Sequence, residues 1–256
     1  MISVITPTAY DYTYFLESLQ CYYGIVDEVF VGLDRDRISW AGNKFTFNED
    51  DFYEQVQKID VDKKVTIIED NFHPLDKPMK NETYEKNYLS SLCKPGNWIL
   101  QIESDEFMLN PNEFKKWLEE NKDFQGRVRG QWITVYKAFG DDLLLPNDKG
   151  GQVAIGTKLQ GQYTVARETN EPDIQSPMLL LHYSWGRTKA ELLEKFKNWG
   201  HAGDFDPDTY ADMWDKVTLE NYQEFSNLHP LDPSGWPNLL KVNRKDYENK
   251  DKKHAE

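Results

Sequence analysis

A short apolar run that ends in acidic residues constrains the fold of this chain more than any other feature. The run covers Trp98–Ile102 and lies between a Pro-Gly-Asn turn and an Asn-Pro turn. It is too short for a typical helix and predicts a buried core strand. Glu103 and Asp105 follow it two positions apart, so extended geometry points both carboxylates to the same face. The pattern therefore predicts a hard-oxygen site for Mg²⁺ or Mn²⁺ at the carboxyl end of a strand.

Extended and helical patterns alternate through the first half of the chain. The predicted strands cover 2–5, 28–33, 65–68 and 98–102, and the predicted helices between them cover 15–23, 51–59 and 81–92. Thr6-Pro7-Thr8 is expected to end the first strand, and Asn81 to cap the last helix. This order predicts an α/β fold with a mainly parallel sheet and helices on both faces. The acidic ends of the strands would then lie at one edge.

The second half of the chain has weaker patterns. Its predicted elements are helices that begin near 111, 188 and 206 and strands at 126–136, 162–167 and 178–183. Thr188 and Glu191 form a capping box, which supports the second of these helices. Residues 141–161 are rich in Gly, Asp and Asn and predict a loop.

The composition fits one large α/β domain that covers residues 1–242. The chain has 256 residues, and the 39% that are hydrophobic are ample for a core. Residues 243–256 are charged and poor in apolar residues, so they predict a flexible tail. The formal charge of −14 argues against binding of nucleic acid or anionic membranes by bulk electrostatics. An anionic ligand can still bind when a divalent cation bridges it to the protein.

The cysteines and the N-terminus bear on the compartment. Cys21 and Cys93 match no metal-ligand spacing and predict buried thiols, which fits a reducing environment. The chain enters a strand at Ile2 with no basic, apolar leader, and no segment is apolar enough to span a membrane. We therefore expect a cytoplasmic protein with no transmembrane segment.

Several segments, in their order and spacing, resemble the GT-A glycosyltransferases, and in particular the family 2-like enzymes. The motifs are the strand Ile2–Thr8, the strand that ends in Asp34, the triplet Glu103-Ser104-Asp105, and the segments Leu181–Trp185 and Lys195–His201. The resemblance implies a metal-dependent, hexosyltransferase-type transfer from a nucleoside diphosphate sugar, a UDP-sugar first of all, to an acceptor hydroxyl. Residues 1–110 would then form the nucleotide-binding half and residues 111–242 the acceptor half.

The same resemblance implies roles for individual residues. Mn²⁺ or Mg²⁺ would be bound by Asp105, with Glu103 and His182 as further ligands. Glu103 replaces the usual aspartate and is longer by one methylene, so it could act through water or on the ribose instead. The residues expected to contact the nucleotide are Thr6, Pro7, Thr8, Asp34, Lys86, Asn87, Glu103 and Ser104. Relatives often carry Arg-Asn where this chain has Lys86-Asn87, and lysine keeps the charge but loses the bidentate fork.

The acceptor half offers less specific candidates. The resemblance and the aromatic content indicate Trp132, Trp185 and His201 as contacts of the donor or acceptor sugar. Inverting enzymes of this fold use a carboxylate that faces the acceptor hydroxyl, whereas a retaining enzyme needs no such base. The candidate bases are Glu168, Glu171, Asp173 and Asp204, and each also fits an ordinary surface acid.

Structural explanations and other functions remain open beside this interpretation. The acidic triplet also fits a solvated turn, His182 a core histidine, and Trp199 and Trp214 core packing. A sugar-phosphate nucleotidyltransferase would use a similar scaffold, but such enzymes carry a Gly-rich basic loop where this chain has Thr6–Asp11. A non-catalytic carbohydrate-binding protein would explain the aromatic content, yet it would not need the acidic triplet.

Overall fold

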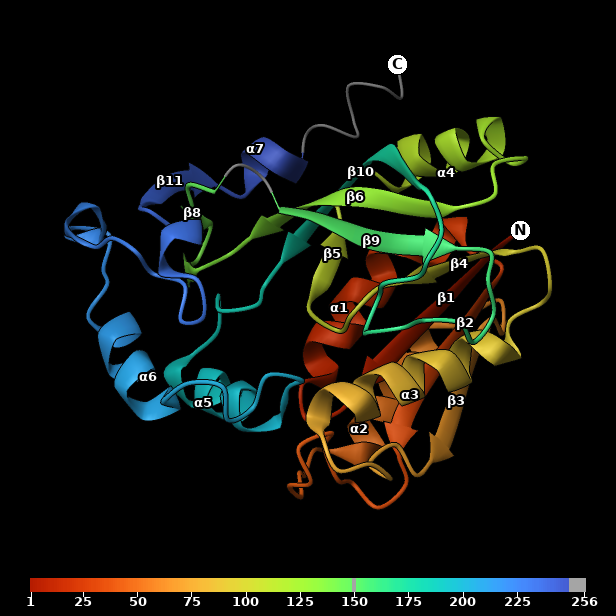
Figure 1. The fold of residues 1–256 in the computed structure, drawn as a ribbon, viewed down its shortest axis with the longest axis horizontal. Coiled ribbons are helices and arrows are strands. Elements are labelled where there is room, and N and C mark those ends of the chain that lie inside the picture. The colour runs from red at the N-terminus through yellow and green to blue at the C-terminus, as the bar shows by residue number, and fades with distance from the viewer. Residues whose placement is uncertain (149–150, 249–256) are drawn as a thin grey trace.

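A mixed sheet of eight strands forms the centre of this computed structural model, which describes residues 1–148 and 151–248 (Figure 1). In spatial order the strands are β3 (Val65–Asp70), β2 (Glu28–Asp34), β1 (Ile2–Thr8), β4 (Trp98–Gln101), β9 (Gly151–Thr157), β6 (Arg127–Thr134), β10 (Asp173–His182) and β5 (Glu106–Met108). The first four are mutually parallel, and β9 is antiparallel to both neighbours. β10 is parallel to β6 and antiparallel to β5. The predicted α/β, GT-A-like architecture is confirmed.

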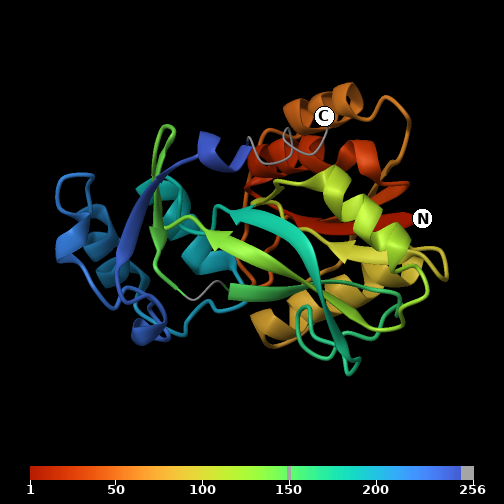
Figure 2. The same ribbon diagram turned by 90° about the horizontal axis from the view of Figure 1, so that it is seen from above.

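Helices cover both faces of this sheet, as the alternating pattern predicts. They are α1 (Tyr12–Tyr22), which the short 3₁₀ helix η1 (Tyr23–Ile25) extends, α2 (Glu49–Ile59), α3 (Pro78–Leu92) and α4 (Pro111–Glu120). Figure 2 shows α1, α2 and α4 on one face and α3 on the other. Because successive strand residues point to opposite faces, Val4 packs in one core cluster with Phe15 of α1, whereas Ile5 packs in another with Leu89 of α3.

β1 extends to Thr8, so the prediction that Thr6-Pro7-Thr8 ends the strand is wrong. β1 pairs with β2 as far as Thr8 but with β4 only as far as Ile5. Pro7 lacks an N–H group and is tolerated here because one side of the strand has no partner at this point. The extension carries the end of β1 to the edge at which β2 ends.

The prediction that Asn81 caps α3 is also wrong, because the helix begins three residues earlier, at Pro78. The Asn81 side chain accepts a hydrogen bond from the Leu75 amide and donates to the Trp40 carbonyl oxygen. Asn81 therefore ties the loop after β2 to the start of α3. This loop is part of the site described below.

The prediction that the glycine-rich segment 141–161 forms a loop is wrong, because this segment contains two strands. β8 (Asp142–Pro146) belongs to a small second sheet, and β9 lies in the middle of the large one. Gly156 allows β9 to approach β4, since a methyl group at this position would collide with Leu100. A glycine that weakens a strand pattern in the sequence is here required by the packing of that strand.

Residues 162–167, all of them described, form no regular strand, which contradicts another prediction. They belong to a strap, residues 158–172, that α3 holds against the sheet. Asn87 donates a hydrogen bond to the Tyr163 carbonyl and accepts one from its amide, at 3.0 and 2.7 Å. The Ala166 amide donates to the Thr83 hydroxyl at 2.8 Å. The strap brings Arg167 to the end of β4.

The second half has an aromatic core of its own, at the left of Figure 1. Its elements are β7 (Lys137–Phe139), α5 (Lys189–Asn198), α6 (Pro207–Asp215), η2 (Tyr222–Glu224), η3 (Pro233–Gly235), β11 (Leu239–Asn243) and α7 (Lys245–Glu248). The helix starts predicted near residues 111, 188 and 206 are all confirmed. Thr188 and Glu191 form the capping box of α5, and the Asp206 carboxylate accepts from two amides of the first turn of α6.

The C-terminal residues are folded beyond the expected domain boundary at residue 242. Asn243 pairs within β11, and α7 follows it. The rest of the predicted tail, residues 249–256, lies outside the described residues. Among the helices that are described, none combines the length and the apolar character needed to cross a membrane.

Candidate functional site

A cavity of about 710 Å³ opens at the carboxyl ends of β1, β2 and β4, facing the aromatic second half. Parallel strands bring the loops that follow them to one edge, and this volume is within the range of roughly 300–1,000 Å³ of small-molecule sites. The predicted residues that line it are Pro7, Thr8, Asp34, Glu103, Ser104, Asp105, Trp132, Glu168, His182, Trp185 and His201. The predicted residues outside the lining are Thr6, Lys86, Asn87, Glu171, Asp173 and Asp204.

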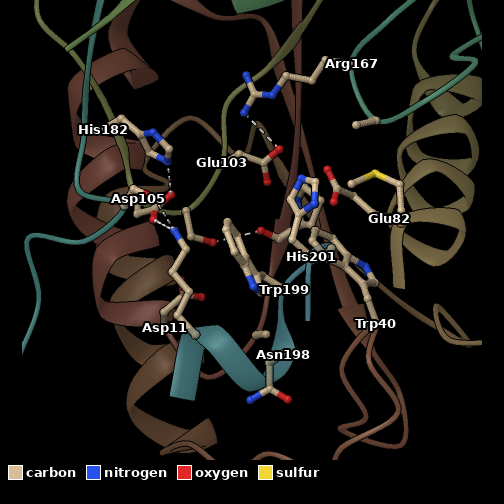
Figure 3. A pocket seen from close by; sticks show the side chains of 18 of the residues that line it. Asp11, Trp40, Glu82, Glu103, Asp105, Arg167, His182, Asn198, Trp199 and His201 are labelled. Carbon is tan, nitrogen blue, oxygen red and sulfur yellow. Dashed lines mark hydrogen bonds and ion pairs between the residues drawn. The ribbon is translucent and has the colours of Figure 1, made fainter. Parts of the chain in front are cut away.

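Asp105 lies at the centre of a buried charge network. Its Oδ2 atom is 2.6 Å from both Arg187 Nη2 and Lys195 Nζ, and its Oδ1 atom is 3.5 Å from His182 Nε2 (Figure 3). Burial alone would raise the pKa of Asp105, but Lys195, His182 and Arg187 outweigh it and hold the pKa well below its usual range. Asp105 is therefore an ionised carboxylate.

Glu103 is held by a second pair of basic side chains. Its Oε1 atom is 3.0 Å from Arg167 Nη2 (Figure 3). The same atom is 2.6 Å from Lys86 Nζ. Burial raises the pKa of Glu103, yet the two cations lower it below its ordinary value. Lys86 also contacts Glu82 at 2.6 Å, so it reaches the site through the two carboxylates, although it does not line the cavity itself.

Glu106, the third acid after β4, has a structural role. Its side chain is fully buried and accepts hydrogen bonds from Arg167, from Trp132 Nε1 and from the Glu103 amide, each at 2.7 to 2.9 Å. These contacts close the turn that follows β4 and hold Glu103 in place. The short strand β5 that begins at Glu106 then pairs with β10 next to His182.

The predicted nucleoside residues fall into two groups. Asp34 lines the cavity, but its carboxylate accepts four hydrogen bonds from its own surroundings, from the amides of Asp36, Ile38 and Phe72 and from His73 Nδ1. It shapes the loop after β2. The Thr8 hydroxyl, in contrast, is buried in the cavity wall with no hydrogen-bond partner among the described residues. A ligand could supply that partner.

The exposure of the tryptophans differs from what the sequence predicts. Trp185 is only 3% exposed and lies within the aromatic core, next to Phe196, Tyr210 and Trp236. Trp199, which the sequence assigns to the core, is partly exposed and lines the cavity. Trp132 is also partly exposed and stacks on His182, with ring centroids 4.6 Å apart.

The candidate bases all have polar or basic partners within the fold. Asp173 lies outside the cavity, against Arg127 and Arg129. Glu168 lines the cavity but contacts the same two arginines. Asp204 is 2.9 Å from His201 Nδ1. Glu171, the remaining candidate, accepts hydrogen bonds from two threonines of the strap region. None of these contacts presents an unpaired carboxylate to the cavity.

Several important residues are not evident from the sequence. Arg167, Arg187 and Lys195 reach the acidic turn from the strap, from the loop after β10 and from α5. No local pattern marks Arg167. Lys195 lies in a segment that carries the resemblance to GT-A enzymes, which is the one signal that could have indicated it. Trp40 and Glu85 also line the cavity without any sequence signal.

The residues present fit a divalent cation in part. Asp105 Oδ1 and His182 Nε2 face each other at 3.5 Å. Among the described residues, the lysine and arginine partners of Asp105 contact its Oδ2 atom and not Oδ1. The Glu103 carboxylate is turned to Lys86 and Arg167 instead. Within the described part of the chain, no three His, Cys, Asp or Glu side chains are grouped to hold one metal ion. Any ion would therefore need ligands from a substrate.

Neither a protein-family model nor a curated protein sequence matches the chain. Among solved structures, S. aureus TarS 1-349 in complex with UDP-GlcNAc is similar at 17% identity and a TM-score of 0.37, over 54% of this chain and 36% of that chain. A mannose-6-phosphate isomerase from Helicobacter pylori is similar at 10% identity and a TM-score of 0.36, over 58% of this chain and 56% of that one. This chain thus spans about a third of the TarS chain.

Proposed function

We propose that this protein is a glycosyltransferase whose donor is a nucleoside diphosphate sugar, with a UDP-sugar expected. The observation that supports this most is the buried group of basic side chains beneath the cavity, in a chain with a formal charge of −14. Lys86, Arg167, Arg187 and Lys195 all lie against Glu103 or Asp105. Such donors at the carboxyl edge of a parallel sheet suit a diphosphate.

The charges of this network also favour a divalent cation, and we propose Mn²⁺ or Mg²⁺. The network contains four basic side chains, but their carboxylate partners outnumber them: Asp11, Glu82, Glu103, Asp105 and Glu106. A diphosphate brought to this network without a cation would meet an excess of negative charge.

Asp105 and His182 would hold the ion, with diphosphate oxygens as the remaining ligands. Mg²⁺ and Mn²⁺ are commonly bound by one or two protein ligands together with substrate phosphates. When bound, the ion acts as a Lewis acid that offsets charge on the leaving diphosphate. Arg187 and Lys195 keep Asp105 ionised, and therefore ready to bind a cation.

The acceptor would bind on the side of the cavity formed by the second half. Trp132 and Trp199 are partly exposed there, and His201 lines the same wall. Aromatic faces suit the apolar faces of sugars, and imidazole can hydrogen-bond a hydroxyl. The transfer of a hexose to an acceptor hydroxyl is the reaction that this arrangement would serve.

The test is calorimetric titration of UDP and of GDP into the protein, with Mn²⁺ and then with EDTA, followed by an assay for UDP release from UDP-sugars. We expect UDP to bind with Mn²⁺ and to bind at least roughly tenfold more weakly with EDTA. Asp105→Asn should lose this dependence on Mn²⁺, while Asp62→Asn, an exposed acid, serves as the control. UDP affinity that EDTA leaves unchanged would remove the cation from the proposal. Binding of neither nucleotide would refute the proposed function.

A further inference from the structure

A second buried carboxyl group lies in the cavity wall, apart from the acidic turn after β4. Glu85 projects from α3, is only 3% exposed and lines the cavity. Its Oε2 atom accepts a hydrogen bond of 2.6 Å from Trp40 Nε1, which is its one hydrogen-bond partner among the described residues. The other carboxyl oxygen lies over Gly32 of β2, where a methyl group would overlap it. Glycine at this position therefore makes room for the carboxyl group.

The surroundings of Glu85 differ from those of the charge network next to it. Trp40, Phe72 and Met79, which also line the cavity, are apolar or aromatic. The neighbouring residue in α3, Lys86, points instead to Glu103 and so marks the diphosphate end of the site. Adjacent residues of one helix thus have different partners: Glu85 contacts Trp40 and Gly32, whereas Lys86 contacts the carboxylates of Glu82 and Glu103.

Glu85 is a carboxylic acid at neutral pH. Burial raises the pKa of Glu85 to about 8; the hydrogen bond from Trp40 lowers it, and the negative charge of Glu103 raises it. Lys86 on the same helix lowers this pKa, and Asp34 on β2 raises it further. A protonated carboxyl group offers one O–H donor and one carbonyl acceptor side by side.

We propose that Glu85 selects the nucleobase of the donor by pairing with an edge that presents an N–H group beside a carbonyl, as uracil does. Trp40 orients the carboxyl group through its indole N–H. The base lies against Glu85 in the cavity wall, and the diphosphate lies at Lys86 and the acidic turn. This inference rests on the proposed function, because it assigns the base of the same donor nucleotide.

The pairing predicts a specific pattern of substitutions. Glu85→Gln keeps a donor and an acceptor in the same shape but cannot ionise, whereas Glu85→Leu keeps the volume and removes both. We expect the glutamine variant to bind UDP within about threefold of the wild type, and the leucine variant to bind it roughly tenfold or more weakly. UDP methylated at N3, which lacks the N–H group, should bind the wild type as weakly as UDP binds the leucine variant.

Inorganic diphosphate with Mn²⁺ serves as the internal control, because it reaches only the charge network. Its affinity should be the same in the wild type and both variants, which also shows that the variants are folded. UDP binding by the wild type should weaken above about pH 8 as Glu85 ionises, while the glutamine variant stays constant.

The outcomes separate this inference from the proposed function. If UDP binds the leucine variant as tightly as it binds the wild type, and diphosphate does the same, Glu85 does not recognise the base, although the proposed function stands. Equal affinity for UDP and its N3-methyl derivative overturns the pairing in the same way. If the wild type binds neither UDP nor diphosphate, the proposed function fails and this inference fails with it.

Discussion

Replacement of Glu85 by glutamine should make the stability of the folded protein less sensitive to pH. Below about pH 4.5, its ordinary pKa, Glu85 is protonated in both the folded and the unfolded chain, so it contributes no pH dependence. As the pH rises toward 8 the unfolded chain ionises and the folded chain does not, because burial raises the pKa of Glu85 to about 8 in the folded state. The free energy of unfolding therefore falls over this interval.

The size of this effect follows from the two pKa values. Between about pH 5 and about pH 8, the two pKa values correspond to a decrease of about 3.5 kcal/mol in the free energy of unfolding of the wild type. The Glu85→Gln variant should not show this decrease. The hydrogen bond with Trp40 Nε1 can persist in the variant, since the amide oxygen still accepts it. The variant should thus become progressively more stable than the wild type as the pH rises.

Urea denaturation at several pH values, followed by tryptophan fluorescence, measures this difference directly. Glu54→Gln, on the exposed face of α2, is the matched control and should leave the pH profile unchanged. A difference between Glu85→Gln and the wild type that stays within about 0.5 kcal/mol across this range would refute the argument. It would mean that the Glu85 carboxyl group is hydrated or paired in the folded protein.

Three further substitutions test the packing of the fold and the site. Gly32→Ala places a methyl group on the Glu85 carboxyl group, so we expect urea denaturation to show a loss of about 1–3 kcal/mol; an unchanged midpoint would contradict that contact. Arg187→Met removes one of the two cations on Asp105 and should cost about 3 kcal/mol, with Arg187→Lys costing less; equal losses would show that charge is not the cause. Thr188→Ala removes the capping box of α5 and should cost about 1 kcal/mol in thermal or urea denaturation, and a neutral effect would mean that the start of α5 is held by other contacts.

The sequence predicts those parts of the fold in which a local pattern and its burial agree. The parallel strands β1, β2 and β4 each bury one short apolar run. The helix starts at Thr188 and Asp206 depend on side chains within one turn. The acidic turn after β4 is also local, because Glu103 and Asp105 follow directly on a strand that can lie only in the core. These interactions join residues that are close together in the sequence, so the sequence alone is enough to predict them.

The sequence misplaces elements whose local pattern conflicts with their packing. β9 is rich in glycine and resembles a loop, yet a close approach between strands requires Gly156. Pro7 suggests the end of β1, but it is harmless where only one neighbouring strand pairs. In both cases the outcome depends on how the strand pairs with strands from distant parts of the chain.

Only the tertiary structure decides which side chains complete the site. Asp105 receives its cations from Arg187 and Lys195, more than 80 residues away, and Glu103 receives Arg167 from a strap with no regular secondary structure. Both Trp185 and Trp199 line the cavity, but the sequence cannot show that Trp185 is almost fully buried and Trp199 partly exposed. The sequence by itself determined the sheet and the position of its acidic edge, because these follow from short-range geometry. The neutralisation of that edge and the burial of the Glu85 carboxyl group depend on contacts between residues far apart in the sequence, which exist only once the chain has folded.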